Sequence, residues 1–529
     1  MKPKIFLAAI AAALLGPVLS AGPVLAQKYG GILKAVHREN PPNLSIHDNA
    51  TVSTVWPMMP VYSNLVLYNP AHAEESADDL VAELAETWTW SDNHKRLTFK
   101  LRHGVKWHDG QPFTSADVKY TFDLLRGLTP KKLRINPRKL WYENVKDVTT
   151  QGDYEVSFIL EHPQPSLLSF LATGYSPIYP AHIDVDELRN RAVGTGPFRL
   201  KTYDPDKLIE VEKNPDYFIK GRPYLDGITY TIIKDRSART AALITGQIEI
   251  LFPQEAPPTV RDQVLAAVPQ MVVHKVAQST YYNIVVNTQK PPFDNLKVRQ
   301  AINYALDRGA FLQTQLGGAV AGGVLMPPPY SPWGLPANEL AKLPGWGDAA
   351  KDKAIARTLL TEAGYGPGKP LTLKVSTRAV PLYQDMAVWA IAELKQVGID
   401  ATLDVVESSR WFPMLTRGDY ELGANMTGAG SEDPDANLFE NFSCGSPRNY
   451  SRYCSQEVQA MMERESQETD GKKRLQMVRE VDKRVQIEVA RSMLGQALDF
   501  QMNWPHVKGY VPHHSIYSYG RMQDVWLDK

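Results

Sequence analysis

The order of secondary structure predicted for residues 351–406 constrains the fold of this chain more than any other feature. Apolar periodicity predicts two helices that alternate with two strands, and a glycine follows each helix. The predicted elements are helix 351–363 before Gly364, strand 371–376, helix 382–397 before Gly398, and strand 399–406. A strand–helix–strand order requires parallel pairing with a right-handed crossover, so we predict an α/β fold here.

The first half of the chain differs from this pattern, because it reads mainly as strands and turns. LTFKLR at 97–102 alternates apolar and polar residues, as a half-buried strand does. The other predicted elements are strands 154–160, 208–212, 228–233 and 281–287, a helix from about Asn295, an irregular Gly- and Pro-rich stretch at 317–347, and helices at about 455–468 and 472–493. The chain has 529 residues, which exceeds one ordinary core, so we predict two lobes of different construction.

Composition narrows the functional classes. Hydrophobic residues make up 43% of the chain and charged residues 22%, which is typical of a globular protein. The 58 basic and 58 acidic residues give a net charge of zero. This balance argues against a general electrostatic attraction to nucleic acid or to an anionic membrane, although a local patch could be hidden in the average. We predict no nucleic-acid partner.

The N-terminus has the layout of a secretory signal peptide. Lys2 and Lys4 precede an unbroken apolar run at 5–15, and the stretch 24–26 offers small or aliphatic residues before a cut. The run is shorter than the roughly 20 apolar residues that a membrane span needs, which disfavours the alternative interpretation as an anchor. We predict that residues 1–26 are removed by cleavage after Ala26 and that the mature protein is soluble in the periplasm.

Cys444 and Cys454 are the only two cysteines in the chain. An oxidising compartment and an even number of cysteines favour a disulfide between them, with two free thiols as the alternative. A bond across so short a loop would stabilise the fold by roughly 2–3 kcal/mol in the chain-entropy model. A catalytic thiol is disfavoured by the same argument.

Several segments together resemble one family, the large solute-binding proteins of ATP-driven importers, in its peptide/nickel/opine class (family 5). The segments occur in the order found in that family and span nearly the whole mature chain. They are LTFKLRHGVKWHDGQPFTSADVKYTFD at 97–123, VGTGPFRLKTYDPDKLIEVEKNPDYF at 193–218, GRPYLDGITYTII at 221–233, NTQKPPFDNLKVRQAINYALDR at 287–308 and ELKQVGIDATL at 393–403.

The resemblance implies a two-lobed periplasmic-binding-protein fold of the large type II, cluster C class, with an extra subdomain in the first lobe. Lobe I would comprise residues 27–276, with the extra subdomain at about 58–190, and residues 496–529 would return to it. Lobe II would comprise residues 277–495. The segments that cross between the lobes would form a hinge that closes over a ligand.

The same resemblance implies that the protein binds a solute and does not catalyse a reaction. The protein would capture a small organic solute and deliver it to an inner-membrane ABC permease whose ATPase subunits hydrolyse ATP. We expect a monomer with no cofactor and no enzymatic activity. An exported hydrolase is the alternative from another class, although no recognisable catalytic motif is present. A chaperone or sensor that uses the binding fold is a third interpretation.

The stretch TGAGSEDPDANL at 427–438 places three acids within four positions, and this raises the question of a metal loop. An EF-hand loop that began at Asp433 would need glycine at its sixth position and glutamate at its twelfth. Leu438 and Cys444 stand there instead, so we predict no metal site. A turn explains the pattern better, with Asp433 as the cap of a helix and Pro434 at its first position.

In peptide-binding members of the family, an aspartate just before this loop pairs with the free amino group of the ligand. That position falls on Ala429 here, two residues after Thr427. Glu432 and Asp433 are the other acids that could supply the charge, but both belong to the turn. We therefore predict a carboxylated or aromatic metabolite, such as an opine-like compound or an acylated amino acid, with short peptides as the alternative.

Other candidate ligand-binding residues come from loops and from aromatic positions. Arg378 follows strand 371–376, where its guanidinium could hold a ligand carboxylate in a bidentate fork. The loop after the first strand offers Glu39 and Asn40. The candidate binding set is Glu39, Asn40, Trp56, Tyr281, Arg378, Trp411, Thr427 and Ala429. The alternative for the rings is packing in the core, and for the arginine a surface position. His513 and His514 are interpreted as solvent-facing.

Overall fold

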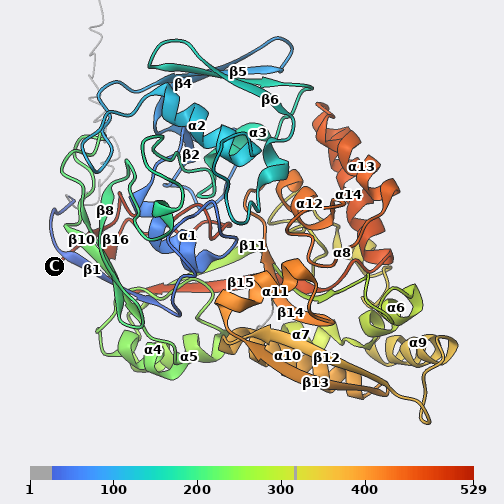
Figure 1. Cartoon of the computed structure of the whole chain (residues 1–529). Coiled ribbons are helices and arrows are strands. Elements are labelled where there is room, and N and C mark those ends of the chain that lie inside the picture. The colour runs from blue at the N-terminus through green and yellow to red at the C-terminus, as the bar shows by residue number, and fades with distance from the viewer. Residues whose placement is uncertain (1–26, 315–318) are drawn as a thin grey trace, which may run out of the picture.

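The computed structural model describes residues 27–314 and 319–529, so the signal peptide predicted at 1–26 lies outside the described residues. Two long antiparallel strands cross the middle of the molecule (Figure 1). They are β11 (Val272–Val286) and β15 (Arg491–Asn503). Their register shifts between Ala277 and Tyr281, and the hydrophobic cores on either side of this irregularity are separate. The chain is therefore a two-lobed α/β protein, as predicted.

The first lobe contains a four-stranded sheet in the order β1-β10-β9-β8. These strands are β1 (Ile32–His37), β10 (Gly227–Ile232), β9 (Leu208–Lys213) and β8 (Phe198–Asp204), and helices α4 (Arg236–Ile244) and α5 (Pro258–Ala267) follow them. β1 is parallel to β10, while the other pairs are antiparallel. Single bridges through Ile250 connect β1 to β15, so this sheet continues into the crossing strands.

A second, fully antiparallel sheet in the order β4-β5-β7-β6 stands at the far end of the first lobe (Figure 1). Its strands are β4 (Ala85–Ser91), β5 (Arg96–Leu101), β7 (Glu155–Leu160) and β6 (Val145–Thr150). Helix α2 (Ser115–Arg126) packs on this sheet through Phe122, whose ring meets Phe158 at a centroid distance of 4.7 Å. This unit lies where the sequence predicts the extra subdomain.

Shorter elements connect this sheet to the rest of the first lobe. They are α1 (Val52–Met58), η1 (Met59–Val61), β2 (Val66–Tyr68), β3 (Leu80–Ala82), η2 (Lys139–Tyr142), α3 (Leu167–Ala172) and η3 (Glu187–Arg189). The end of the chain, with β16 (Val507–Lys508) and β17 (Trp526–Leu527), packs on the same lobe. Trp504 anchors it there, because its indole nitrogen donates to the backbone oxygen of Leu243 at 2.9 Å.

The second lobe is built on a five-stranded sheet in the order β13-β12-β14-β11-β15. The added strands are β12 (Leu371–Arg378), β13 (Ile399–Val406) and β14 (Leu422–Gly428), and the helices around them are α6 (Leu296–Ala305), α7 (Arg308–Thr314), α8 (Ala337–Leu340), α9 (Ala349–Glu362), α10 (Pro381–Lys395) and α11 (Ser408–Arg417). β12 runs parallel to β13, which confirms the predicted strand–helix–strand unit. Gly364 and Gly398 both have left-handed backbones that end the preceding helical segments.

Three further helices form a separate layer beside this sheet: α12 (Pro434–Phe442), α13 (Gln456–Ser466) and α14 (Gly471–Ile487). The helix predicted at 472–493 is wrong at its C-terminal end. It stops at Ile487, because Arg491 and the residues after it pair with β11 instead. Long-range strand pairing thus overrides a helical apolar pattern. Across residues 27–314 and 319–529, no helix combines the length and apolar character needed to cross a membrane.

Candidate functional site

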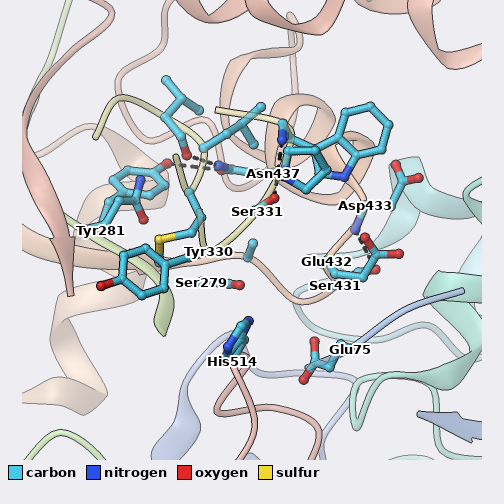
Figure 2. Close-up of a pocket in the computed structure, with 17 residues that line it drawn as sticks. Glu75, Ser279, Tyr281, Tyr330, Ser331, Ser431, Glu432, Asp433, Asn437 and His514 are labelled. Carbon is cyan, nitrogen blue, oxygen red and sulfur yellow. Dashed lines mark hydrogen bonds between the residues drawn. The ribbon is translucent and has the colours of Figure 1, made fainter. Parts of the chain in front are cut away.

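A cavity of about 90 Å³ lies between the two lobes (Figure 2). β11 contributes Ser279 and Tyr281 from the crossing strands, and residues 429–433 contribute the loop between β14 and α12. The complete lining is Glu75, Ser279, Tyr281, Val324, Leu325, Met326, Tyr330, Ser331, Pro332, Trp333, Ala429, Ser431, Glu432, Asp433, Asn437, Gln496 and His514. Segments distant in sequence therefore converge on one space between the lobes.

The acidic loop forms a turn and a helix cap, as predicted. Asp433 accepts a hydrogen bond from the backbone nitrogen of Asp435 at 3.0 Å, and Pro434 opens α12. The guanidinium of Arg474 donates to both carboxylate oxygens of Asp433 at 2.8 Å, and it also contacts Asp435 and Glu465. Asp433 is thus held by an internal partner. Over the described ranges, no group of three or more His, Cys, Asp or Glu is arranged to hold a metal ion.

Two other carboxyl groups face the cavity from opposite lobes. Glu432 belongs to the loop of the second lobe and accepts a hydrogen bond from the hydroxyl of Ser169 at 3.2 Å. Glu75 comes from the first lobe and accepts one from the backbone nitrogen of Ser515 at 3.1 Å. Burial, followed by the charges of Asp433 and Glu75, raises the pKa of Glu432 to about 8.

A second, smaller cavity of about 30 Å³ lies near the first, and Arg378 and Arg448 are among its lining residues. Arg378 stands at the end of β12, where its guanidinium donates to Glu39 at 2.6 Å and to the hydroxyl of Ser408. Burial acts to raise the pKa of Glu39, but Arg378 and Arg38 together hold it down at about 2. The two predicted residues Glu39 and Arg378 are therefore brought together as an ion pair between the lobes.

A buried arginine cluster, which the sequence interpretation missed, lies beside this second cavity. Glu440 on α12 is paired with Arg138 of the first lobe at 3.3 Å and with Arg448 of the second. Arg138 also lies over the ring of Tyr175, 3.3 Å from its centroid, and Tyr175 packs on Tyr517. No local motif signals this arrangement, since its members come from four distant segments.

The remaining predicted binding residues divide into two groups. Tyr281 and Ala429 line the first cavity, and Thr427 lies behind it, accepting hydrogen bonds at 3.0 Å from Asn283 and from Arg491. The second group, Asn40, Trp56 and Trp411, lines neither cavity. The hydroxyl of Tyr281 donates to the side-chain oxygen of Asn437 at 3.1 Å, so its ring is fixed at the cavity wall (Figure 2).

Trp56, Trp411 and Asn40 lie away from the two cavities. Trp56 is fully buried in the first lobe, edge-on to the rings of Tyr230 and Phe252. Trp411 is fully buried beside Gly423 in β14. Asn40 exchanges hydrogen bonds with Asp206, at 2.9 Å from its amide and 2.8 Å to its oxygen, and so holds a turn.

The histidine pair is not solvent-facing, which corrects the prediction. His513 is fully buried against Tyr519, and its Nδ1 lies 3.6 Å from Glu75. His514 lines the first cavity. The segment between β16 and β17 returns to the cavity and packs on the first lobe, and this long-range return buries residues that look exposed in sequence.

The predicted disulfide is confirmed, because Cys444 is bonded to Cys454. The bond closes the loop that follows α12. Asn449 lies inside this loop and donates to the backbone oxygens of Ser443 and Tyr453 at 3.0 and 2.6 Å. The covalent link thus fixes the segment that carries Arg448.

Glu75, Tyr330 and Trp333 are cavity residues that the sequence interpretation did not single out. Tyr330 and Trp333 lie in the stretch MPPPYSPWG, and Glu75 lies in the loop between β2 and β3. The one usable signal was the irregular Gly- and Pro-rich character of 317–347, which predicts a loop or wrapping segment. Its aromatic residues were the part of that loop able to line a binding site.

Comparison with known proteins identifies the family of this chain. Residues 79–449 match the family model described as bacterial extracellular solute-binding proteins, family 5. The chain belongs to this family. Its members are the solute-binding components of ABC importers, so the predicted family is confirmed.

Individual relatives of this solute-binding protein agree with the assignment. Di/tripeptide-binding protein 2 of Pseudomonas aeruginosa is 25% identical over 480 residues, which cover 85% of this chain and 86% of the relative. The murein tripeptide binding protein MppA of Escherichia coli has the same fold, with a TM-score of 0.84 and 21% identity over 96% of this chain and 100% of the other. The binding protein MoaA of A. tumefaciens R10, solved in complex with mannopinic acid, has a TM-score of 0.83 and 22% identity over 95% and 100%.

Proposed function

We propose that this solute-binding protein acts outside the cytoplasm, in the periplasm, after its signal peptide is removed. There it closes its two lobes over a small organic solute and presents the solute, chemically unchanged, to a membrane permease with ATPase subunits. The observation that carries the proposal is the cavity of about 90 Å³ lined by side chains from both lobes at the crossing strands. A site divided in this way is completed only when the lobes close.

The size of the cavity indicates the size of the bound group. At about 10–15 Å³ per water-sized group, 90 Å³ corresponds to on the order of six to nine such groups. This is the scale of a single amino-acid unit. The rest of a larger solute would extend toward the second cavity, where Arg378 and Arg448 lie. We propose a di- or tripeptide or a small carboxylated metabolite as the ligand, in keeping with the names of the relatives.

The role proposed for Arg378 requires an exchange of partners. Its guanidinium already holds Glu39 at 2.6 Å in the closed molecule. A ligand carboxylate would replace Glu39 on the guanidinium fork, or would bind beside the pair. Replacement of Glu39 keeps one anion on the arginine, so in that arrangement the binding energy comes from geometry rather than from a new charge.

A hydrolase is the competing function, since three carboxyl groups line one cavity and the pKa of Glu432 is raised. One experiment separates the two functions. The protein is purified without refolding, examined by native mass spectrometry, and then incubated with the released compound and with di- and tripeptides. Binding without turnover supports the receptor. Altered product masses after incubation would establish the hydrolase instead.

Monomeric state and export are tested together on the same preparation. We expect the mature chain to begin after Ala26 when it is isolated from the periplasmic fraction of an expressing Gram-negative host. Size-exclusion chromatography with light scattering should give the mass of one chain. A cytoplasmic, uncleaved protein would contradict this part of the proposal.

A further inference from the structure

Of the three carboxyl groups that line the first cavity, Glu75 and Glu432 are brought together only by the contact between the lobes. Glu75 lies in the loop between β2 and β3 of the first lobe, and Glu432 lies before α12 of the second. Figure 2 shows both side chains on the same side of the cavity. Like charges that meet across a closing cleft oppose closure unless something neutralises them.

The charge balance around the cavity leaves these acids without a cation. Behind the wall, one arginine, Arg474, is paired with Asp433, Asp435 and Glu465. With Glu75 and Glu432 the cluster contains five acids and one arginine. In the described part of the chain, neither cavity glutamate makes an ion pair with a lysine or an arginine, and the basic side chain nearest to Glu75 is His513 at 3.6 Å.

One buried oxygen points to a missing partner independently of this count. The side chain of Glu75 is fully buried, and its Oε2 has no hydrogen-bond partner among the residues described. Its Oε1, in contrast, is bound by Ser515. A buried carboxylate oxygen without a donor is costly, so a donor from the solute would be strongly favoured there.

The position of Ala429 leaves space for that donor. Ala429 lines the same cavity with a methyl group and is 9% exposed, so no carboxylate stands at this point of the wall. Glu75 and Glu432, instead of a residue at position 429, supply the negative charge that would bind a cationic group. Tyr281 and Tyr330 add aromatic walls that suit a cation with an apolar body.

We propose that the cavity binds a primary ammonium group of the solute between Glu75 and Glu432, and that this group is what allows the lobes to close. The inference rests on the proposed receptor function and names the chemistry of its ligand. It adds a primary ammonium group to what the ligand must carry, a feature that the predicted carboxylated or aromatic metabolite did not include. Because the two carboxylates belong to different lobes, the cation links recognition directly to closure.

The first test needs no ligand. Glu75→Gln/Glu432→Gln removes both ionisable groups while keeping side-chain shape, so the empty double variant should close more than the wild type at pH 9, above the pKa of about 8 of Glu432. Small-angle scattering should then show a smaller radius of gyration for the variant than for the empty wild type. Glu74→Gln, at an exposed neighbouring position, is the matched control and should leave the radius unchanged. Identical radii for the wild type and the double variant would overturn the proposal.

The second test uses three probes: a mixture of di- and tripeptides, the same mixture after N-acetylation, and the non-peptide amines putrescine and agmatine. Free peptides should raise the melting temperature of the wild type, and N-acetylation should weaken binding at least tenfold. Stabilisation by the amines as well would assign the site to ammonium groups in general rather than to peptide N-termini.

The results of these tests distinguish a failure of the ammonium site from a failure of the receptor function. Equal binding of acetylated and free peptides, with closure in scattering, would refute the ammonium site while leaving the receptor function intact. If no probe and no co-purified compound closes the protein, the receptor function fails, and the double variant still decides whether the carboxylates oppose closure.

Discussion

The two lobes contact each other at two places that differ in their electrostatics: one contact joins opposite charges, and the other brings two acidic side chains together. On the side of the second cavity, Glu39 of the first lobe meets Arg378 of the second at 2.6 Å. On the side of the first cavity, Glu75 and Glu432 lie across the cleft from each other, and among the described residues neither forms an ion pair with a lysine or an arginine. The first contact needs no group from a solute, so it favours closure by itself. The second is incomplete, so it makes closure depend on what enters the cleft.

The difference also explains the contrast in acidity between two glutamates at one interface. Glu39 is buried, yet Arg378 and Arg38 keep its pKa near 2. Burial and neighbouring acids instead raise the pKa of Glu432 to about 8. The paired contact gives the receptor a small preference for the closed state. The acidic contact requires a cationic group from the solute before the lobes can close fully.

The largest expected effect comes from breaking the paired contact. Arg378→Met leaves Glu39 in the interface without its main partner, and truncation of one member of a buried charge pair costs about 2–5 kcal/mol. We expect this loss in ligand affinity, measured by isothermal titration calorimetry. Glu39→Gln/Arg378→Met should recover part of it, because no unpaired charge remains. An Arg378→Met protein with wild-type affinity would show that the pair has no part in closure.

The next effect comes from the unpaired contact. Glu432→Gln removes one carboxylate from the ammonium site, and hydrogen bonds to charged groups contribute about 1.5–3 kcal/mol. Affinity for a free di- or tripeptide should fall by roughly 10–150-fold, while any residual affinity for its N-acetylated form stays the same. The same calorimetric titration measures both ligands. Equal losses for both forms would contradict a specific contact with the amino group.

A pH series sharpens the comparison further. The pKa of Glu432 is raised from 4.5 to about 8, so the protonated form stabilises the closed empty protein. That stabilisation is fully present below about pH 4.5 and is lost as the pH rises through 8. The melting temperature of the empty wild type should therefore decline more from pH 5 to 8 than that of Glu432→Gln. Glu75, Asp433 and His514 face the same space, so the difference between the two proteins is the relevant quantity.

Ligand binding should show the complementary pH dependence. An ammonium group prefers the ionised Glu432, so peptide binding at pH 7 should release protons, and affinity should increase from pH 6 toward 8. Calorimetry in buffers of different ionisation enthalpy measures the release. Proton uptake on binding would contradict the account.

The smallest effect is expected at a neutral contact between the lobes. The hydroxyl of Tyr68 lies 3.0 Å from that of Ser431, beside Glu432. Tyr68→Phe removes one uncharged hydrogen bond, worth about 0.5–1.5 kcal/mol. Ligand affinity should fall less than tenfold or so, with no change in its pH dependence. A loss as large as that of Glu432→Gln would show that charge is not what distinguishes the two contacts.

Sequence alone was sufficient for the architecture, because the fold depends on local periodicity and on extended motifs. The alternation around β12 and β13 and the capping role of Asp433 are both readable from neighbouring residues. The end of α14 was not, since strand pairing with β11 decides it.

The site was harder to predict than the fold, because it is assembled from distant segments. Arg378 and Glu39 were each identified from loop position, but their pairing joins residues 339 positions apart. Glu75 and the burial of His513 depend on how the C-terminal segment wraps over the first lobe. Trp56 and Trp411 are aromatic residues of the kind that stack on ligands, yet both are fully buried in the core.

The central claim is that two lobes shut over a solute that remains intact. Its most direct measurement is the distance between spin labels at Lys100→Cys in the first lobe and Val388→Cys in the second, both exposed positions. The account predicts a long distance in the empty protein at pH 7.5 and a shorter, narrower one when a co-purified compound or a free peptide binds, with that compound recovered unaltered. The same distance distribution with and without every bound solute would contradict it.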